Sequence, residues 1–214
     1  MTQQDITTIE CPNCGKQFDI VYWKSLNADI DPNAKEALLA GNFFSSTCPK
    51  CQTDHLLVYP MLYHDMTNKA MIQFITDENH IKNFTSPTND ILLQMQTSMM
   101  HKGYKIRVVK NHNDLVEKAM IFNCGLDDRV IEYLKLLYQT AIFQKNLNLT
   151  SIDARFCYDD SSFKFVVFSN DEFICTINID MEMYAEIAKD IHNEISEKSK
   201  DCFFINQEWA RSLL

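Results

Sequence analysis

The sequence of 214 residues predicts an α+β fold, and two observations lead to that prediction. Two hooks of the form Cys-Pro-x-Cys, at residues 11–14 and 48–51, enclose a strand-like and a helix-like segment. In the last third of the chain, three strand-like segments separated by turn residues precede a helix-like segment. Strands and helices that are grouped in this way, without regular alternation, are typical of α+β proteins.

The segment between the hooks predicts one strand and one helix. Residues 16–24, KQFDIVYWK, are rich in β-branched and aromatic side chains, as strands are. Asp31-Pro32 predicts the start of a helix, with Asp31 as the N-cap and Pro32 at the first helical position, and Gly41 predicts its end. After the second hook, two further strands are expected at 55–63, HLLVYPMLY, and 69–75, KAMIQFI.

The middle of the chain predicts mainly helices. A helix is expected to start at Ser86-Pro87 and to end at Gly103, and its buried face would be formed by Ile91, Leu92, Met95 and Met99. A strand is expected at 104–109, and Asp114 with Glu117 resembles the capping box of a following helix. Gly125 interrupts the pattern, and a longer helix follows with an apolar stripe of Val130, Ile131, Leu134, Leu137, Tyr138, Ala141 and Ile142.

The last third predicts an antiparallel meander of three strands at 152–158, 162–168 and 172–179, because short polar turns join them. A helix should then cover one face of this sheet with Tyr184, Ile187, Ala188, Ile191 and Ile195. We therefore expect two domains, one at 8–110 that contains the hooks and an α+β domain at 111–214.

The two hooks predict a metal site with four cysteine ligands. Each Cys-x-x-Cys turn supplies two thiolates, and Zn²⁺ prefers four thiolates in a tetrahedron. The predicted ligands of one structural zinc ion per chain are Cys11, Cys14, Cys48 and Cys51. The N-terminal part is predicted to be zinc-ribbon-like. The 33 residues between the hooks are more than the commonest zinc fingers have, and the strand and the helix would account for them as an insertion.

The same cysteines suit two other uses. A thioredoxin-like redox pair needs one Cys-x-x-Cys at a strand-to-helix corner, whereas both hooks here lead into strands. An iron site of the rubredoxin type uses the same four ligands, so iron stays an alternative to zinc. Gly15 suits the left-handed conformation that often follows such a hook, but Gln52 occupies the matching position in the second hook.

The remaining cysteines, Cys124, Cys157, Cys175 and Cys202, are expected to be small buried hydrophobic residues.

The polar start of the chain does not resemble a signal peptide, and no apolar run is long enough to span a membrane, so a cytoplasmic protein is expected. The formal charge is −9, and four thiolates with one Zn²⁺ would make it −11. This acidity argues against nucleic acid as the partner.

The hooks CPNC and CPKC, together with the segments LVYPMLYHDM and LVEKAMIFNCGLDDRVIEYLK, resemble the CpXC-domain family over roughly the first two thirds of the chain. The resemblance implies a prokaryotic domain that binds a metal through four cysteines. It implies no particular activity.

One candidate active site is the pair His64-Asp65, which follows a predicted strand and could act as a general base with an orienting carboxylate. Neighbouring residues on a strand point to opposite faces, so a structural role at a turn is the alternative. The pairs Asp127-Asp128 and Asp159-Asp160 suit a helix start and a turn, and Asp29 with Asp31 suits an N-cap region. Common hydrolase and nuclease motifs are missing from the sequence.

Three functions remain, and the first is favoured. The chain is predicted to be a non-catalytic module that binds another protein and has a structural zinc site. The alternatives are an enzyme with an interdomain active site near His64 and Asp65, and a zinc ribbon that binds nucleic acid. Formation of a homo-oligomer stays open, because sequence does not reveal which strand edges are free.

Overall fold

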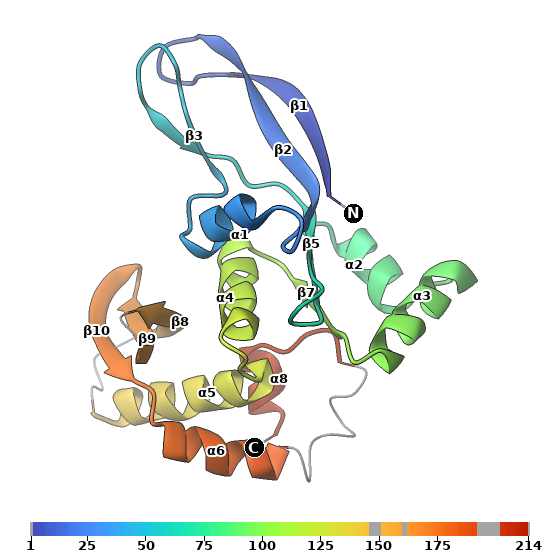
Figure 1. Cartoon of the computed structure of the whole chain (residues 1–214). Coiled ribbons are helices and arrows are strands. Elements are labelled where there is room, and N and C mark those ends of the chain that lie inside the picture. Colours follow the sequence, from blue (N-terminus) through green and yellow to red (C-terminus); the bar gives the residue numbers. More distant parts are fainter. Residues whose placement is uncertain (1, 146–150, 160–161, 192–201, 214) are drawn as a thin grey trace. The chain divides into compact units, whose positions relative to one another are not determined.

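The structure, a computed structural model, describes residues 2–145, 151–159, 162–191 and 202–213 (Figure 1). It is a mixed α+β protein, as predicted, and it divides into two compact units at residues 1–119 and 120–214. The domain ranges 8–110 and 111–214 stay a prediction. No helix of the described residues is both long and apolar enough to cross a membrane.

The first unit is built on a five-stranded sheet with the order β1-β2-β5-β6-β7. The strands are β1 (Gln3–Glu10), β2 (Gln17–Asn27), β5 (Met61–Asp65), β6 (Ala70–Phe74) and β7 (Lys105–Val109). The pairs β1/β2 and β5/β6 are antiparallel, and the pairs β2/β5 and β6/β7 are parallel. The strands predicted at 16–24, 69–75 and 104–109 are therefore present.

A helix and a small hairpin are inserted between β2 and β5. They are α1 (Pro32–Leu39), β3 (Ser45–Thr47) and β4 (Asp54–Leu56), and β3 pairs with β4 as a separate two-stranded sheet. Helix α1 begins and ends where the sequence predicts, with Gly41 at φ +76°. The carboxylate of Asp31 accepts a hydrogen bond from the hydroxyl of Thr2, however, and makes no bond to the helix that it precedes.

The single strand predicted at 55–63 is wrong in one respect, because the segment forms two strands in two different sheets. β4 ends at Leu56 and β5 begins at Met61, directly after Pro60. Proline has no N–H to donate to a strand ladder, which explains the break between the strands.

Strand β2 contains an irregularity that matters below. Gln4 pairs with Trp23 and Gln3 pairs with Ser25, so one extra residue of β2 is accommodated between the two pairs. Beyond this bulge, β2 pairs with β5 only through Ser25, Leu26 and Asn27. The earlier part of β2 is thus paired with β1 alone among the described strands.

The core of the first unit lies where α1 and the segment around Phe44 meet the sheet. Its largest fully buried side chains include Leu26, Leu38, Met61, Tyr63, Ile72 and Phe74. The ring of Phe44 makes edge contacts with Tyr59 and Phe74 at centroid distances of 5.3 and 6.2 Å. Edge-to-face pairs of this kind contribute about 0.5–1.5 kcal/mol each beyond their burial.

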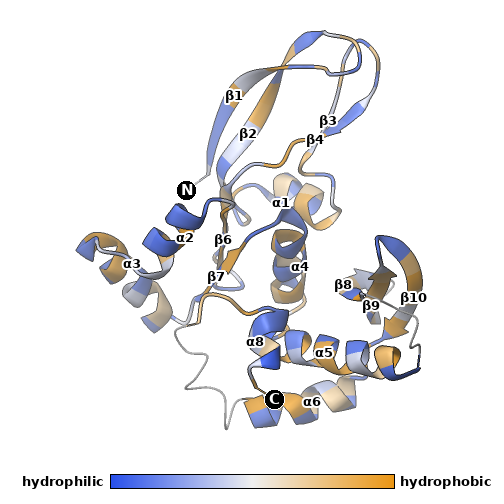
Figure 2. Ribbon diagram, turned by 180° about the vertical axis from the view of Figure 1, so that it is seen from behind, coloured by the Kyte–Doolittle hydropathy of each residue, from blue (hydrophilic) through white to orange (hydrophobic). Residues whose placement is uncertain are grey.

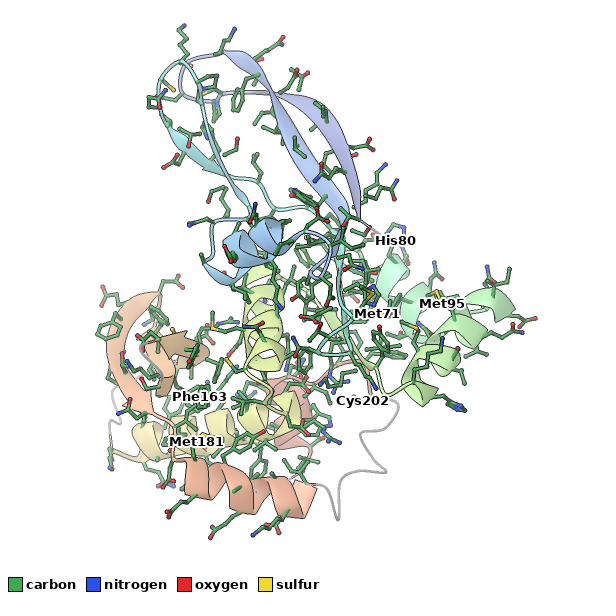
Figure 3. All side chains as sticks on the ribbon, viewed as in Figure 1. Met71, His80, Met95, Phe163, Met181 and Cys202 are labelled. Atoms are coloured by element: carbon green, nitrogen blue, oxygen red, sulfur yellow. The ribbon has the colours of Figure 1, made fainter. Side chains whose placement is uncertain are left out.

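The next two helices differ from the prediction. A helix that was not predicted, α2 (Glu78–Thr85), precedes α3 (Asp90–His101), and α3 begins after the N-cap Asn89. The predicted buried face of α3 is wrong, since Ile91 is 76% exposed and Met95, labelled in Figure 3, is 46% exposed. The inward residue is Gln96, whose amide donates to the carbonyl of Phe84 over 2.8 Å. Figure 2 shows that α2 is largely hydrophilic, so it offers little apolar surface to α3.

Helix α4 (His112–Asn123) begins earlier than the capping box predicts. The cap is Asn111, whose side-chain oxygen accepts from the N–H of Asp114 over 2.8 Å. Asp114 therefore lies in the first turn of the helix, where the helix dipole stabilises its negative charge.

The second unit confirms the predicted meander. It contains α5 (Asp128–Lys145), β8 (Asp153–Asp159), β9 (Ser162–Ser169), β10 (Glu172–Asn178), α6 (Met181–Asp190) and α8 (Gln207–Arg211), and the three strands have the antiparallel order β10-β9-β8. The helix that packs on the sheet is α5, through an edge contact of Tyr138 with Phe165 at 5.6 Å.

Helix α6 contacts α5, contrary to the expectation that it covers the sheet. The hydroxyl of Tyr184 accepts from the N–H of Asp127 over 2.8 Å, just before α5 begins. The place next to the strands is taken by α5, whose Tyr138 contacts Phe165 and whose Gln139 amide donates to the carbonyl of Ile152 over 3.2 Å. Ile195, part of the predicted face of α6, lies outside the described residues.

Candidate metal centre

The two cysteine hooks have the same backbone conformation. In the first, the N–H of Gly15 donates to the carbonyl of Cys11, and the N–H of Cys11 donates to that of Lys16, both over 2.9 Å. In the second, Gln52 donates to Cys48 over 3.0 Å and Cys48 donates to Thr53 over 2.9 Å. The residue after each second cysteine is left-handed, with φ +67° at Gly15 and φ +57° at Gln52. The two hooks are therefore equivalent, although only one of them has glycine.

We expect Gln52→Gly to stabilise the protein by about 1 kcal/mol, because it relieves a left-handed conformation that costs a residue with a Cβ roughly this much. Gln52→Val should destabilise it, since a β-branched side chain suits this conformation least. Equilibrium unfolding of the three proteins in denaturant measures the effect. A lower stability of Gln52→Gly than of the parent would contradict the prediction, and the weak bond from the Gln52 amide to the carbonyl of Pro49 (3.3 Å) would then be the larger contribution.

The hooks bring the four predicted ligands together. The Sγ atoms of Cys11, Cys14, Cys48 and Cys51 all lie within 4.8 Å of one another. Two of the pairs that join the hooks are 3.6 Å apart, between Cys11 and Cys51, and 3.7 Å apart, between Cys14 and Cys48. Four sulfurs that are each about 2.3 Å from one Zn²⁺ are about 3.8 Å apart in a regular tetrahedron. The cluster has the size that such an ion requires.

The surroundings of the sulfurs favour ionised thiols, but not all four at once. The side chain and backbone of Thr53 lower the pKa of Cys51 to about 5, and the backbone N–H groups of Cys51 and Lys50 lower the pKa of Cys48. The backbone of Lys16 also lowers the pKa of Cys14, but burial and the other thiols outweigh it and raise that pKa to about 12. Like charges at this distance oppose each other, so four thiolates need a cation among them.

Three polar side chains support the cluster, and none of them was predicted from the sequence. Nε2 of His55 on β4 lies 3.3 Å from Sγ of Cys11, and Oγ1 of Thr53 lies 3.3 Å from Sγ of Cys51. The amide of Asn13 donates to the same Thr53 hydroxyl over 3.0 Å, which ties the first hook to the second. All three residues are close to the hooks in the sequence. That closeness could have marked them as candidate neighbours of the cysteines, but it does not show which cysteine or hook each of them contacts.

The residues His64 and Asp65 do not form a pair. Nε2 of His64 lies 3.2 Å from the hydroxyl of Tyr104, and burial lowers the pKa of this histidine. Asp65 is only 1% exposed and faces the other side of β5, where it accepts from Lys35 Nζ (3.0 Å) and the Tyr63 hydroxyl (3.1 Å). It also accepts from the backbone and the side chain of Asn68 over 2.8 and 2.9 Å. The carboxylate thus closes the β5–β6 turn and anchors α1.

The other acidic candidates have structural partners too. Asp29 accepts from the N–H groups of Met66 and Thr67 over 2.6 and 3.2 Å, so it holds the β5–β6 turn and not a helix start. Asp127 caps α5, accepting from the N–H of Arg129 over 2.9 Å. Asp159 accepts from the hydroxyl of Ser162 over 3.4 Å as a turn residue, and Asp160 lies outside the described residues.

The four remaining cysteines do not join the cluster of described ligand residues. Each is only partly buried, so the expectation that all four are buried is wrong. Cys157 and Cys175 do lie within strands, β8 and β10, as predicted.

The fold and the cluster define a class of protein in which two equivalent Cys-x-x-Cys turns, separated by an inserted strand and helix, meet in one site. The model of the CpXC protein family matches residues 9–135, which is more than half of the chain. The chain therefore belongs to the CpXC family. No curated protein and no solved structure matches it.

Proposed function

We propose that the chain is a non-catalytic protein-interaction module whose N-terminal unit is stabilised by one zinc ion bound to Cys11, Cys14, Cys48 and Cys51. The observation that carries the proposal is the cluster of four Sγ atoms within 4.8 Å, presented by two equivalent hooks. Four thiolates complete the tetrahedral shell of Zn²⁺ and leave no position for a substrate, which is the arrangement of structural sites.

The ion would supply cross-linking and charge neutralisation. The first hook follows β1, whose residues are nearly all exposed, and the second hook joins β3 to β4, which have three residues each. Strands this short bury too little to hold their place without further support. Structural zinc in finger peptides contributes an apparent 10–16 kcal/mol or so, which would dominate the stability of this end of the unit.

The interaction role rests on exposed edges and charge. β1 is an edge strand of eight residues, and Ile6 on it is 70% exposed. Edges of this kind bind other chains by strand pairing. The acidic balance of the chain, with a formal charge of −9, favours a protein over nucleic acid as the partner.

An enzyme near His64 and Asp65 gains no support from the geometry. Asp65 is buried, and four donors saturate its carboxylate, so it is not available to orient His64 or to accept a proton from a substrate. A general base must reach the proton that it abstracts, and the buried Asp65 does not; His64 is partly exposed, but Asp65 does not orient it.

Native mass spectrometry with metal analysis tests the proposal on protein purified without chelator or affinity-tag metal. One zinc per chain is the expected result, with loss of the folded N-terminal unit when a chelator removes the metal. Iron in place of zinc would correct the identity of the ion and leave its role. A chain that carries no metal, or that keeps its full thermal stability after chelation, would overturn the structural role.

A further inference from the structure

A pocket of about 260 Å³ lies in the first unit between β2 and the chain around β3. β2 forms one wall with Asp19 and Val21, the chain around β3 forms another with Phe43, Ser45 and Ser46, and Tyr59 comes from the segment between β4 and β5. Ser46 pairs in the β3/β4 register with His55, whose Nε2 lies 3.3 Å from Sγ of Cys11. The pocket and the cysteine cluster therefore share the β3–β4 hairpin, which lies alongside β2 in Figure 1.

The wall formed by β2 presents main-chain groups to this pocket. The N–H of Cys11 donates to the carbonyl of Lys16 over 2.9 Å, at the end of the β1/β2 ladder, so the main chain of Lys16 faces β1. Because N–H and C=O groups alternate between the two edges along a strand, those of Phe18 and Ile20 also face β1, and those of Asp19 and Val21 point to the opposite side. The bulge after Trp23 reverses this alternation, which is consistent with the N–H of Ala28 donating to His64 on β5 over 2.8 Å.

This edge of β2 is available for a further strand. β5 pairs with β2 only at Ser25–Asn27, and none of the described strands pairs with the segment from Gln17 to Trp23 on that side. An extended peptide that adds to such an edge gains affinity from main-chain hydrogen bonds and specificity from alternate side chains.

We propose that the pocket binds an extended, basic segment of a partner protein, which adds as a strand to the outer edge of β2. This inference rests on the proposed function and names the class of partner. The charge of the segment follows from Asp19, an exposed residue of the pocket lining whose carboxylate also accepts from the hydroxyl of Thr8 over 2.6 Å, and from the other lining residues, which include no lysine or arginine. The rings of Phe43 and Tyr59 add aromatic faces, which attract the cationic groups of lysine and arginine.

The metal site would control this pocket through the hairpin. Ser45 and Ser46 belong to β3, whose end leads directly into Cys48. Removing the ion would free the hairpin and take away one wall, so binding of the segment requires a metal-loaded chain. A site on β2 alone would not have this requirement.

Fluorescence anisotropy on the full zinc-loaded chain tests the proposal with three labelled peptides. The first is Thr-Val-Lys-Val-Lys-Thr, the second has Glu in place of both Lys, and the third keeps the lysines but is N-methylated at alternate residues. We expect the first to bind and the other two to bind at least tenfold more weakly. Equal binding of the first and third would reduce the effect to charge attraction and overturn strand addition.

Two variants test the pocket itself. Val21→Pro removes an N–H that faces the pocket without removing a bond to β1, so binding of the first peptide should be lost. Asp19→Asn should weaken it about fivefold, whereas Asp5→Asn, which changes an exposed carboxylate of β1 outside the pocket, should not. If Val21→Pro does not fold, Asp19→Asn and the N-methylated peptide decide.

Metal content and thermal unfolding are measured on the same samples, so that two failures can be told apart. If no peptide binds to a chain that carries one zinc and loses stability on chelation, the strand-addition site is wrong and the proposed function stands. If chelation leaves stability unchanged, the structural zinc is wrong. If chelation removes peptide binding together with the stability, both inferences are supported.

Discussion

Cys48→Ser is expected to lose the metal and to unfold the N-terminal unit, instead of leaving a folded protein with an altered surface. Cys48 is fully buried, and its sulfur lies 3.7 Å from that of Cys14, so its loss removes a quarter of the coordination shell from inside the site. A serine hydroxyl stays protonated at neutral pH and does not replace a thiolate. Since structural zinc supplies about 10–16 kcal/mol in finger peptides, even a partial loss exceeds what a small unit can tolerate.

The matched control is Cys175→Ser on β10, a half-buried cysteine outside the cluster. It should keep one metal ion per chain and change the free energy of unfolding by about 1 kcal/mol or less. Metal analysis and thermal unfolding followed by far-UV circular dichroism compare the two variants. A Cys48→Ser protein with its full metal content and its original melting temperature would refute the structural role of the site.

The cysteine hooks could be predicted from sequence because their chemistry is local. A Cys-x-x-Cys turn brings its two sulfurs together whatever the rest of the chain does, and Gly15 marks the left-handed residue that follows it. Gln52 adopts the same conformation without that marker. Its strain is compensated by the hydrogen bonds of the second hook, which no pattern of residue types reveals.

The side chains around the sulfurs could not be predicted in the same way. His55 reaches Cys11, a residue 44 positions earlier, because β4, which pairs with β3 across the second hook, carries it to the first hook. His64 and Asp65 are adjacent in the sequence and so suggest a pair. Because successive side chains of a strand point to opposite faces, His64 contacts Tyr104 and Asp65 contacts Lys35 instead.

The strands were predicted well and the packing of the helices less well. Alternation and β-branched residues define a strand locally, which explains the success with β2, β6 and the meander. Which face of a helix is buried depends on the neighbour that it meets. α3 meets the carbonyl of Phe84 through Gln96, so Ile91 and Met95 remain exposed despite their helical spacing.

Asp65→Ala is expected to destabilise the first unit by about 3–5 kcal/mol, the usual cost of removing one partner of a buried ion pair. Asp65 is 1% exposed, and its loss would leave Lys35 and the hydroxyl of Tyr63 without the acceptor that they share. Tyr63 is itself fully buried, so water cannot replace the carboxylate there without opening the core. Chemical denaturation at pH 7 measures the difference in the free energy of unfolding.

The pH dependence separates this charge effect from a simple loss of packing. Burial raises the pKa of Asp65, but the hydrogen bonds from Asn68 and the charge of Lys35 outweigh burial and hold the pKa below its usual value. A lowered pKa in the folded state means that Asp65 stabilises the protein above about pH 4, the pKa of an unfolded aspartate, and that this contribution is lost as the pH falls through the folded pKa. The deficit of Asp65→Ala relative to the parent should therefore shrink on acidification.

Asp153→Ala, which removes a half-exposed carboxylate paired with Arg155, should cost about 1 kcal/mol or less at any pH, because exposed ion pairs contribute little. A deficit of Asp65→Ala that stays constant down to pH 2 would show that the lost packing, and not the lost charge, destabilises the variant.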